Sequence, residues 1–212
     1  MNNLFSFRYT ASKPDGWRWS LEPNGKFTVK SAYKALSLAA GVNSCGGQEV
    51  ELLTVWKAQV PLKAKTTAWR ILMGRMATCD NLQRRKVINS NADATCILCK
   101  EEIETSDHVF FSCKLTSNLW YAILKWVGKH SVLPRRAKDH LEAFRNLGEK
   151  EDTSFLNTIW LCFVWCVWKW RNVCKFQQEE WKAERVLAEI KTRTWGWVSA
   201  FSKQPNLRDF RS

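Results

Sequence analysis

The chain has 212 residues, 45% of them hydrophobic, and its 33 Lys and Arg residues exceed its 20 Asp and Glu residues to give a formal net charge of +13. Such a chain can bury a core as one domain or two small ones, and its basic charge favours an anionic partner, most commonly a nucleic acid. The N-terminus lacks the basic and apolar regions of a signal peptide. We therefore expect an intracellular protein, nuclear or cytoplasmic, whose 8 cysteines stay reduced rather than forming a disulfide framework.

Residues 17–29, with the sequence WRWSLEPNGKFTV, show the alternation that is typical of a β-hairpin. Every second residue from Trp17 to Leu21 is apolar, and the Pro-Asn-Gly sequence that follows favours a turn. We expect two short strands here. Ser31 is the predicted N-cap of a helix that follows them.

The next segment combines predicted helices with a concentration of basic residues. Residues 42–53 contain a Gly-Gly pair and little periodicity, so we expect a linker, followed by helices over KAKTTAWRILMGR and CDNLQRRKVI. Between Lys57 and Lys86, eight basic residues and one acid give a net charge of +7. These helices either present a solvated basic face or bind the phosphates of RNA or DNA. The candidate contacts are Lys63, Lys65, Arg70, Arg75, Arg84, Arg85 and Lys86.

Four residues of metal-ligand type then occur within eighteen positions. Cys96, Cys99, His108 and Cys113 form the pattern C-x2-C-x8-H-x4-C. Three thiolates and one imidazole complete a tetrahedron around zinc and leave no position for a reactive water, so we predict one Zn²⁺ ion with a structural role. The alternative is that Cys96 and Cys99 are core thiols and His108 is a hydrogen-bonded histidine.

The predicted metal-binding loop is acidic. From Asp93 to Asp107, five carboxylates are accompanied by one lysine, for a net charge of −4. Because an acidic loop is a poor phosphate binder, we expect contacts with nucleic acid to come mainly from the basic segment before it. The other two histidines, His130 and His140, lie singly among charged residues, and we expect them on the surface.

The last third of the chain is predicted to be helical. Apolar residues recur at helical spacing in KLTSNLWYAILKWVGKH and in the final EEWKAERVLAEIKTRTWGWVSAF. Between them, Phe155 to Trp168 is a nearly apolar run of 14 residues, too short to cross a membrane and typical of a buried helix. Its Trp residues suggest base stacking, but aromatic residues on every side of the helix favour burial. The remaining cysteines are expected to be free, buried thiols: Cys45, Cys79, Cys162, Cys166 and Cys174.

Several of these segments together resemble a known family. The runs VPLKAKTTAWRILMGRMATCDNLQRRKV and CILCKEEIETSDHVFFSC, with the following LW, are similar to the zinc-binding region of plant LINE-type (non-LTR) retrotransposon reverse transcriptases. The upstream DGWRWSLEPNGKFTVKSAY resembles the start of that region, and WKWRNVCKF resembles a Trp-x-x-Arg-Asn-x-x-x-Phe stretch that follows it. The resemblance implies the zinc ligands Cys96, Cys99, His108 and Cys113. Its recurrent W-R-x-L-x-G-R and D-N-L-x-R-R elements fall on residues 69–75 and 80–85.

The carboxylates expected of a polymerase are not evident. Reverse transcriptases hold two metal ions with carboxylates that in this family include an adjacent Asp-Asp pair, whereas none of the seven aspartates here adjoins another. No cluster suggests a ribonuclease H site either. We therefore expect a non-catalytic protein without a small-molecule substrate, corresponding to the zinc-binding segment encoded alone.

The sequence thus predicts a mainly α-helical protein with a small N-terminal β-hairpin and a Cys3His zinc knuckle. Three regions are expected: 1–53 with hairpin, helix and linker, 54–130 with the reverse transcriptase-type zinc-binding domain, and 131–212 with a helical region and tail. The predicted function is zinc-dependent binding of RNA or DNA. The alternatives are a zinc-stabilised module that binds a protein partner, and a retroelement remnant without a selected function.

Overall fold

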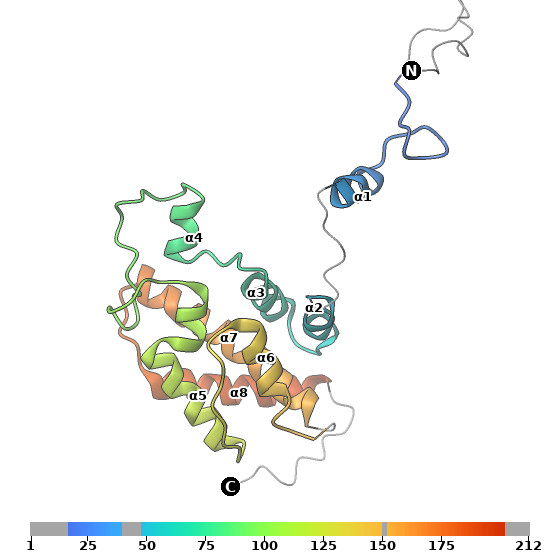
Figure 1. Ribbon diagram of the computed structural model, residues 1–212. Helices are drawn as coiled ribbons and strands as arrows, with labels where there is room; N and C mark the ends of the chain where they lie inside the picture. Colours follow the sequence, from blue (N-terminus) through green and yellow to red (C-terminus); the bar gives the residue numbers. More distant parts are fainter. Residues whose placement is uncertain (1–16, 40–47, 150–151, 202–212) are drawn as a thin grey trace, which may run out of the picture. The chain divides into compact units, whose positions relative to one another are not determined.

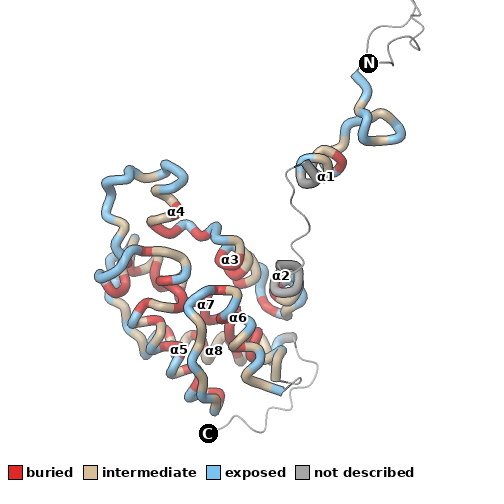
Figure 2. The backbone as a smooth tube through the Cα atoms, in the orientation of Figure 1, coloured by how far each residue is buried: buried red, intermediate tan, exposed pale blue. Residues whose placement is uncertain are grey.

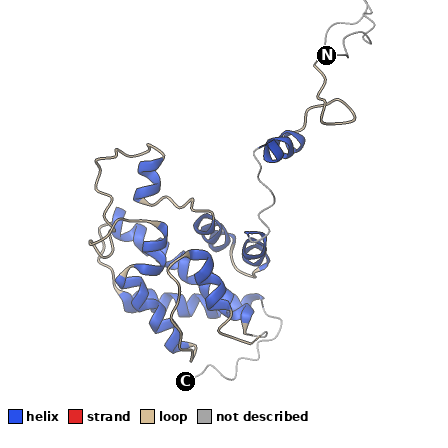
Figure 3. Cartoon of the chain, in the orientation of Figure 1, coloured by secondary structure: helices blue, strands red, loops and turns tan. Residues whose placement is uncertain are grey.

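The structure of the protein is a computed structural model, which describes residues 17–39, 48–149 and 152–201. Those residues form eight α-helices and one π-helix, and they contain no β-strand (Figure 1, Figure 3). The chain divides into two compact units, residues 1–46 and residues 47–212. The prediction of a mainly helical protein therefore holds, but its β-hairpin does not.

The predicted hairpin at residues 17–29 is wrong, because these residues form a closed turn. The Trp19 N–H donates to the Gly25 carbonyl at 2.8 Å, and the Gly25 N–H donates to the Glu22 carbonyl at 2.9 Å. Gly25 has a φ of 69°, which the turn requires and glycine adopts without strain. Two strands without a third strand or a packed face are marginally stable, and Val29, expected in the second strand, instead begins a helix.

Helix α1 (Val29–Ala39) begins earlier than the sequence predicts. The Thr28 hydroxyl accepts a hydrogen bond from the Ser31 N–H at 3.2 Å, so Thr28, not Ser31, occupies the N-cap position. Ser31 is instead buried, and its hydroxyl accepts a hydrogen bond from the Trp19 indole at 2.7 Å. Helix capping and this indole contact together fix the turn against the helix.

The second unit is a bundle of helices around one long central helix (Figure 1). The central helix α7 packs against α3, α6 and α8, while α2 packs on α3 and α5 packs on α8 and on the π-helix η1. The elements are α2 (Gln48–Lys57), α3 (Leu62–Leu72), α4 (Cys79–Arg84), η1 (His108–Ser112), α5 (Lys114–Trp126), α6 (Ala137–Arg145), α7 (Thr153–Phe176) and α8 (Ala183–Phe201).

Helix α7 forms the core of the bundle, as its apolar sequence predicts. All residues from Ile159 to Val164 are completely buried. Figure 2 colours the backbone tube by burial, with buried residues in red. The helix extends to Phe176 and therefore includes the WKWRNVCKF stretch. None of the helices within the described ranges combines the length and apolar character needed to cross a membrane.

Two local predictions are wrong in this unit. Residues 48–53, expected in a linker, belong to α2. His140, expected on the surface, is fully buried on α6, where its Nδ1 accepts a hydrogen bond from the Trp160 indole at 3.1 Å. Helix α6 exposes Asp139 and Glu142 and places His140 and Phe144, four positions apart, on its buried face. Burial lowers the pKa of His140 to about 3. His130 is exposed, as expected.

Candidate metal centre and basic surface

The four predicted metal ligands come together in one cluster. One ligand atom from each of Cys96, Cys99, His108 and Cys113 lies within 4.8 Å of the others. Cys96 and Cys113 are completely buried, and Cys99 and His108 are at most 9% exposed. The cluster therefore forms a small, nearly solvent-free site.

Backbone hydrogen bonds explain why these spacings bring the ligands together. The Lys100 N–H donates to the Cys96 carbonyl at 2.8 Å, which closes the turn that carries the first two cysteines. The Cys113 N–H donates to the His108 carbonyl at 2.8 Å across the π-helix. Because a π-helix bonds residues five apart, the x4 interval between His108 and Cys113 matches one of its turns.

A short backbone pairing supports the first cysteine. Thr95 and Ile103 form an isolated antiparallel β-bridge. On either side of it, the Cys96 N–H donates to the Glu102 carbonyl at 2.8 Å, and the Glu104 N–H donates to the Ala94 carbonyl at 2.7 Å. The backbone groups of two acidic residues, Glu102 and Glu104, thus hold the two sides of the loop together.

A carboxylate orients the imidazole of the cluster. His108 Nε2 lies 3.3 Å from the Cys99 sulfur, so this nitrogen faces the other ligands. The opposite nitrogen, Nδ1, lies 3.2 Å from a Glu102 carboxylate oxygen. Metal-binding histidines commonly donate this second N–H to a carboxylate, which fixes the ring and its tautomer. This role of Glu102 was not predicted, because the charge pattern describes the acidic residues of the loop only through their net charge.

The donor atoms fit a zinc ion. A tetrahedral site with Zn–S bonds of about 2.3 Å separates its sulfur atoms by about 3.8 Å, and the four donors are already gathered within 4.8 Å. A hydrogen bond between the two sulfurs lowers the pKa of Cys113 and, together with burial, raises that of Cys96. Zinc would bind both sulfurs as thiolates, so its binding releases protons.

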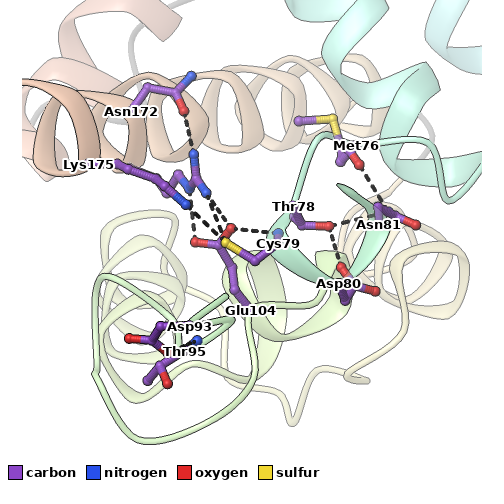
Figure 4. A network of polar contacts seen from close by, with 11 residues as sticks. Met76, Thr78, Cys79, Asp80, Asn81, Asp93, Thr95, Glu104, Asn172 and Lys175 are labelled. Atoms are coloured by element: carbon purple, nitrogen blue, oxygen red, sulfur yellow. Dashed lines mark hydrogen bonds and ion pairs between the residues drawn. The ribbon is translucent and has the colours of Figure 1, made fainter. Parts of the chain in front are cut away.

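A buried ion pair connects the same loop to the central helix. Arg171 of α7 donates from Nε to a Glu104 carboxylate oxygen at 2.9 Å and from Nη2 to the other oxygen. The Glu104 carboxylate also accepts a hydrogen bond from the Cys79 N–H at 3.1 Å. Figure 4 shows Glu104 and Cys79 facing α7, where Lys175 Nζ lies 3.0 Å from the Cys79 sulfur. The loop between the ligands, the start of α4 and α7 thus meet in one polar network.

The WKWRNVCKF stretch supplies the α7 side of this network. Arg171 also donates to the Asn172 side-chain oxygen at 2.9 Å, and its guanidinium lies 4.9 Å from the centre of the Trp168 ring. Trp168 in turn packs against Phe110 of η1, with ring centres 6.1 Å apart. This stretch, which stands out in the sequence only by its resemblance to the family, therefore contacts the metal-binding loop.

The remaining cysteines within the described ranges are free and buried, as predicted. Cys162 and Cys166 lie one turn apart on α7, with their sulfurs 3.9 Å apart. Burial raises the pKa of Cys174. Cys45 lies outside the described residues.

The seven predicted nucleic-acid contacts lie on two helices and the turns that follow them. Lys63 and Arg70 are exposed and share one face of α3, whereas Lys65 lies on another flank and donates to the Trp56 carbonyl at 3.0 Å. Arg75 follows α3. Arg84, Arg85 and Lys86 are exposed at the end of α4, and Arg84 donates to the Asn81 side chain. None of the seven forms an ion pair with another residue of the described chain.

Comparison with known families identifies the segment that contains this cluster. Residues 27–120 match the family described as zinc-binding in reverse transcriptase. The matched segment makes up less than half of the 212-residue chain. The resemblance found in the sequence is thereby confirmed for residues that include all four clustered ligands, although Arg171 and α7 lie beyond the matched segment.

A plant protein is also similar to this chain. The Arabidopsis thaliana protein named "Putative ribonuclease H protein" is 26% identical in an alignment of 167 residues that covers 74% of this chain. The aligned part is 24% of that relative, so the chain spans about a quarter of its length. No solved structure gives a significant match.

Proposed function

We propose that the chain binds one structural zinc ion and uses the resulting fold to bind RNA or DNA, without catalysing a reaction. The observation that carries this proposal is the buried cluster of three cysteines and one histidine inside a reverse-transcriptase zinc-binding segment. The free, buried thiols support an intracellular role, where such cysteines stay reduced.

The chain's own groups define the proposed role of the zinc. Cys96, Cys99, His108 and Cys113 supply four donors, which fill a tetrahedral ion and leave no site for substrate or activated water. Glu102 holds the imidazole by its second nitrogen. Zinc, when bound, links the Cys96 turn to η1 and to the start of α5, so its contribution is to stability rather than chemistry.

The distribution of charge supports nucleic acid as the partner. The seven candidate cations have no ion-pair partner among the described residues, so they are available to phosphate groups. The acidic loop is less repulsive than its sequence indicates, because Glu104 is buried against Arg171 and Glu101 pairs with Lys114. Both features favour binding of an anion near the metal-binding loop.

The arrangement of carboxylates supports a non-catalytic role. Among the described residues, the potential metal ligands that gather in a group of three or more are the cysteines and the histidine of the cluster, and this group contains no carboxylate. The name of the Arabidopsis relative refers to ribonuclease H, but this chain spans only 24% of that protein. We therefore expect that the purified chain will neither extend a primer nor cleave RNA in a hybrid duplex with magnesium or manganese. Turnover that survives purification would contradict the proposal.

Fluorescence anisotropy with single-stranded RNA, single-stranded DNA and duplex at several salt concentrations tests the binding role. Replacing Arg84, Arg85 and Lys86 together by Ala removes three exposed cations, so the slope of log affinity against log salt should flatten by about 2 for single strands. Phosphate contacts carry little base information, so the loss should be similar for all sequences. Unchanged affinity and slope in this variant would show that the basic segment is not the contact surface.

A second candidate function, binding of a protein partner, is favoured by the N-terminal unit. Several large apolar side chains on its turn and on α1 are exposed, namely Trp17, Leu21, Phe27, Val29 and Leu36. Exposed apolar groups gathered on a small unit are typical of interaction surfaces. If the chain binds no nucleic acid even at low salt, this becomes the better assignment.

A further inference from the structure

A second group of basic residues lies far along the chain from the predicted basic segment. The sequence PRRAK before and at the start of α6 contains Arg135, Arg136 and Lys138. Arg135 and Arg136 are exposed, and none of the three forms an ion pair with any described residue. These side chains carry charges that no neighbour within the described chain neutralises by direct pairing.

The fold brings this second group to the end of the first. A pocket of about 500 Å³ is lined by Arg84 from α4 and by Arg136 and Lys138 from the start of α6. Its remaining walls come from the end of α3 and from residues 105–107, directly before the ligand His108. Two basic groups about fifty positions apart in sequence therefore meet at one cavity.

Carboxylates also line this pocket, but two of them are engaged in helix starts. Asp80 accepts a hydrogen bond from the Thr78 hydroxyl at 2.5 Å at the start of α4. Asp107 accepts a hydrogen bond from the Ala137 N–H at 3.2 Å at the start of α6. Asp139 completes the acidic side. Since none of these carboxylates pairs with Arg84, Arg136 or Lys138, the cations remain available to an external anion.

We propose that this pocket holds a backbone phosphate of bound nucleic acid, so that Arg84 joins the basic segment and the Arg135–Lys138 group into one binding surface. A guanidinium group binds a phosphate through two parallel hydrogen bonds, and two such groups line the cavity. RNA and DNA share this phosphodiester chemistry. The inference rests on the proposed nucleic-acid function and adds residues that lie outside the family match at 27–120.

A charge-matched pair of variants tests the surface. Arg135→Ala/Arg136→Ala removes two cations from the proposed surface, and Lys125→Ala/Lys182→Ala removes two exposed lysines from α5 and from the residue before α8. With full-length protein and single-stranded RNA or DNA, the first variant should flatten the salt slope by about 1.4 and weaken binding on the order of tenfold at 0.1 M salt. The control should keep the parental slope. Equal losses in both variants would show a net-charge effect and overturn the proposal.

The shared pocket makes a second, sharper prediction. If Arg84 and Arg136 hold the same phosphate, the double variant Arg84→Ala/Arg136→Ala should lose less affinity than the product of the two single losses. Multiplicative losses would place the two side chains on separate phosphates and overturn the shared site. Zinc content and the circular-dichroism melting curve of each variant check that the fold is retained.

The outcomes separate this inference from the function on which it rests. A parent protein that binds no RNA, DNA or duplex at low salt overturns the nucleic-acid function and this surface together. A parent that binds and depends on Arg84, Arg85 and Lys86, but not on Arg135 and Arg136, retains the proposed function and refutes only the extended surface. Parallel measurements on RNA and DNA of one sequence identify which backbone is preferred.

Discussion

Arg171 and Glu104 are 67 positions apart in sequence and form an ion pair in which both side chains are almost completely buried, at 3% and 0% exposure. The pair joins the C-terminal part of α7 to the loop between the cysteine turn and His108. A buried ion pair contributes little by itself, but removing one partner leaves an uncompensated charge in the interior. The metal-binding loop and the helical bundle should therefore unfold together.

Replacing Arg171 by Met should destabilise the protein by about 3–5 kcal/mol, because Glu104 then remains buried without its counter-ion. Urea unfolding followed by circular dichroism measures this loss. The double variant Arg171→Met/Glu104→Gln should recover part of it, since the amide oxygen still accepts the Cys79 N–H and no buried charge remains. A single variant as stable as the parent would contradict the proposed coupling.

Metal analysis of the purified chain should give one zinc per molecule. Structural zinc in finger peptides contributes about 10–16 kcal/mol of apparent binding free energy at neutral pH, which is coupled to folding. Cys99→Ser should therefore lose the metal and unfold the loop. Cys174→Ser, which changes a buried thiol outside the cluster, is the matched control and should retain one zinc. Full metal content in the Cys99 variant would remove this residue from the ligand set.

Replacing Glu102 by Ala should weaken zinc binding by about 10- to 100-fold, because the His108 imidazole loses the carboxylate that orients it. Competition with a fluorescent zinc chelator measures the change. Glu101, the neighbouring residue in the sequence, provides a control with the same charge, since its carboxylate pairs with exposed Lys114 instead of the histidine. Equal affinities in Glu101→Ala and Glu102→Ala would mean that Glu102 does not position the ligand.

The features that the sequence predicted are those set by neighbouring residues. The metal-ligand pattern depends on one tight turn and one π-helical turn, so its spacing could be read directly. The apolar run in α7 predicted that this helix is buried, because it contains almost no polar residue to face solvent. The hairpin prediction failed although its pattern was also local, because the hydroxyl of Thr28 caps α1 and takes Val29 out of the expected strand.

Contacts between distant segments left no comparable signal in the sequence. Arg171 and Glu104 each resemble ordinary surface charges until the fold places them together. The pocket that joins Arg84 to Arg136 likewise depends on how α4 and α6 are arranged. His140 was misplaced because its charged neighbours describe the outer face of α6, while the residue itself belongs to the inner face.

The buried His140 should make stability depend on pH. Its pKa is about 3 in the folded chain, against about 6.5 in an unfolded one. Above pH 6.5 both states are neutral and the full stability is present. As the pH falls from 6.5 towards 3, His140 is protonated in the unfolded state but stays neutral in the folded state. The free energy of unfolding therefore decreases by about 1.4 kcal/mol per pH unit.

Comparison with a His140→Phe variant isolates this contribution, since release of the proposed zinc ion would also destabilise the protein in acid. Phe preserves the ring beside Phe111 and Trp120, whose centres lie 4.6 and 4.4 Å from that of His140. It removes the acceptor for the Trp160 indole, so the variant should be less stable at pH 7. Between pH 6 and pH 5, its unfolding free energy should nevertheless fall by about 1 kcal/mol less than that of the parent. Parallel pH dependences in urea unfolding would show that His140 takes up its proton in the folded state as readily as in the unfolded one.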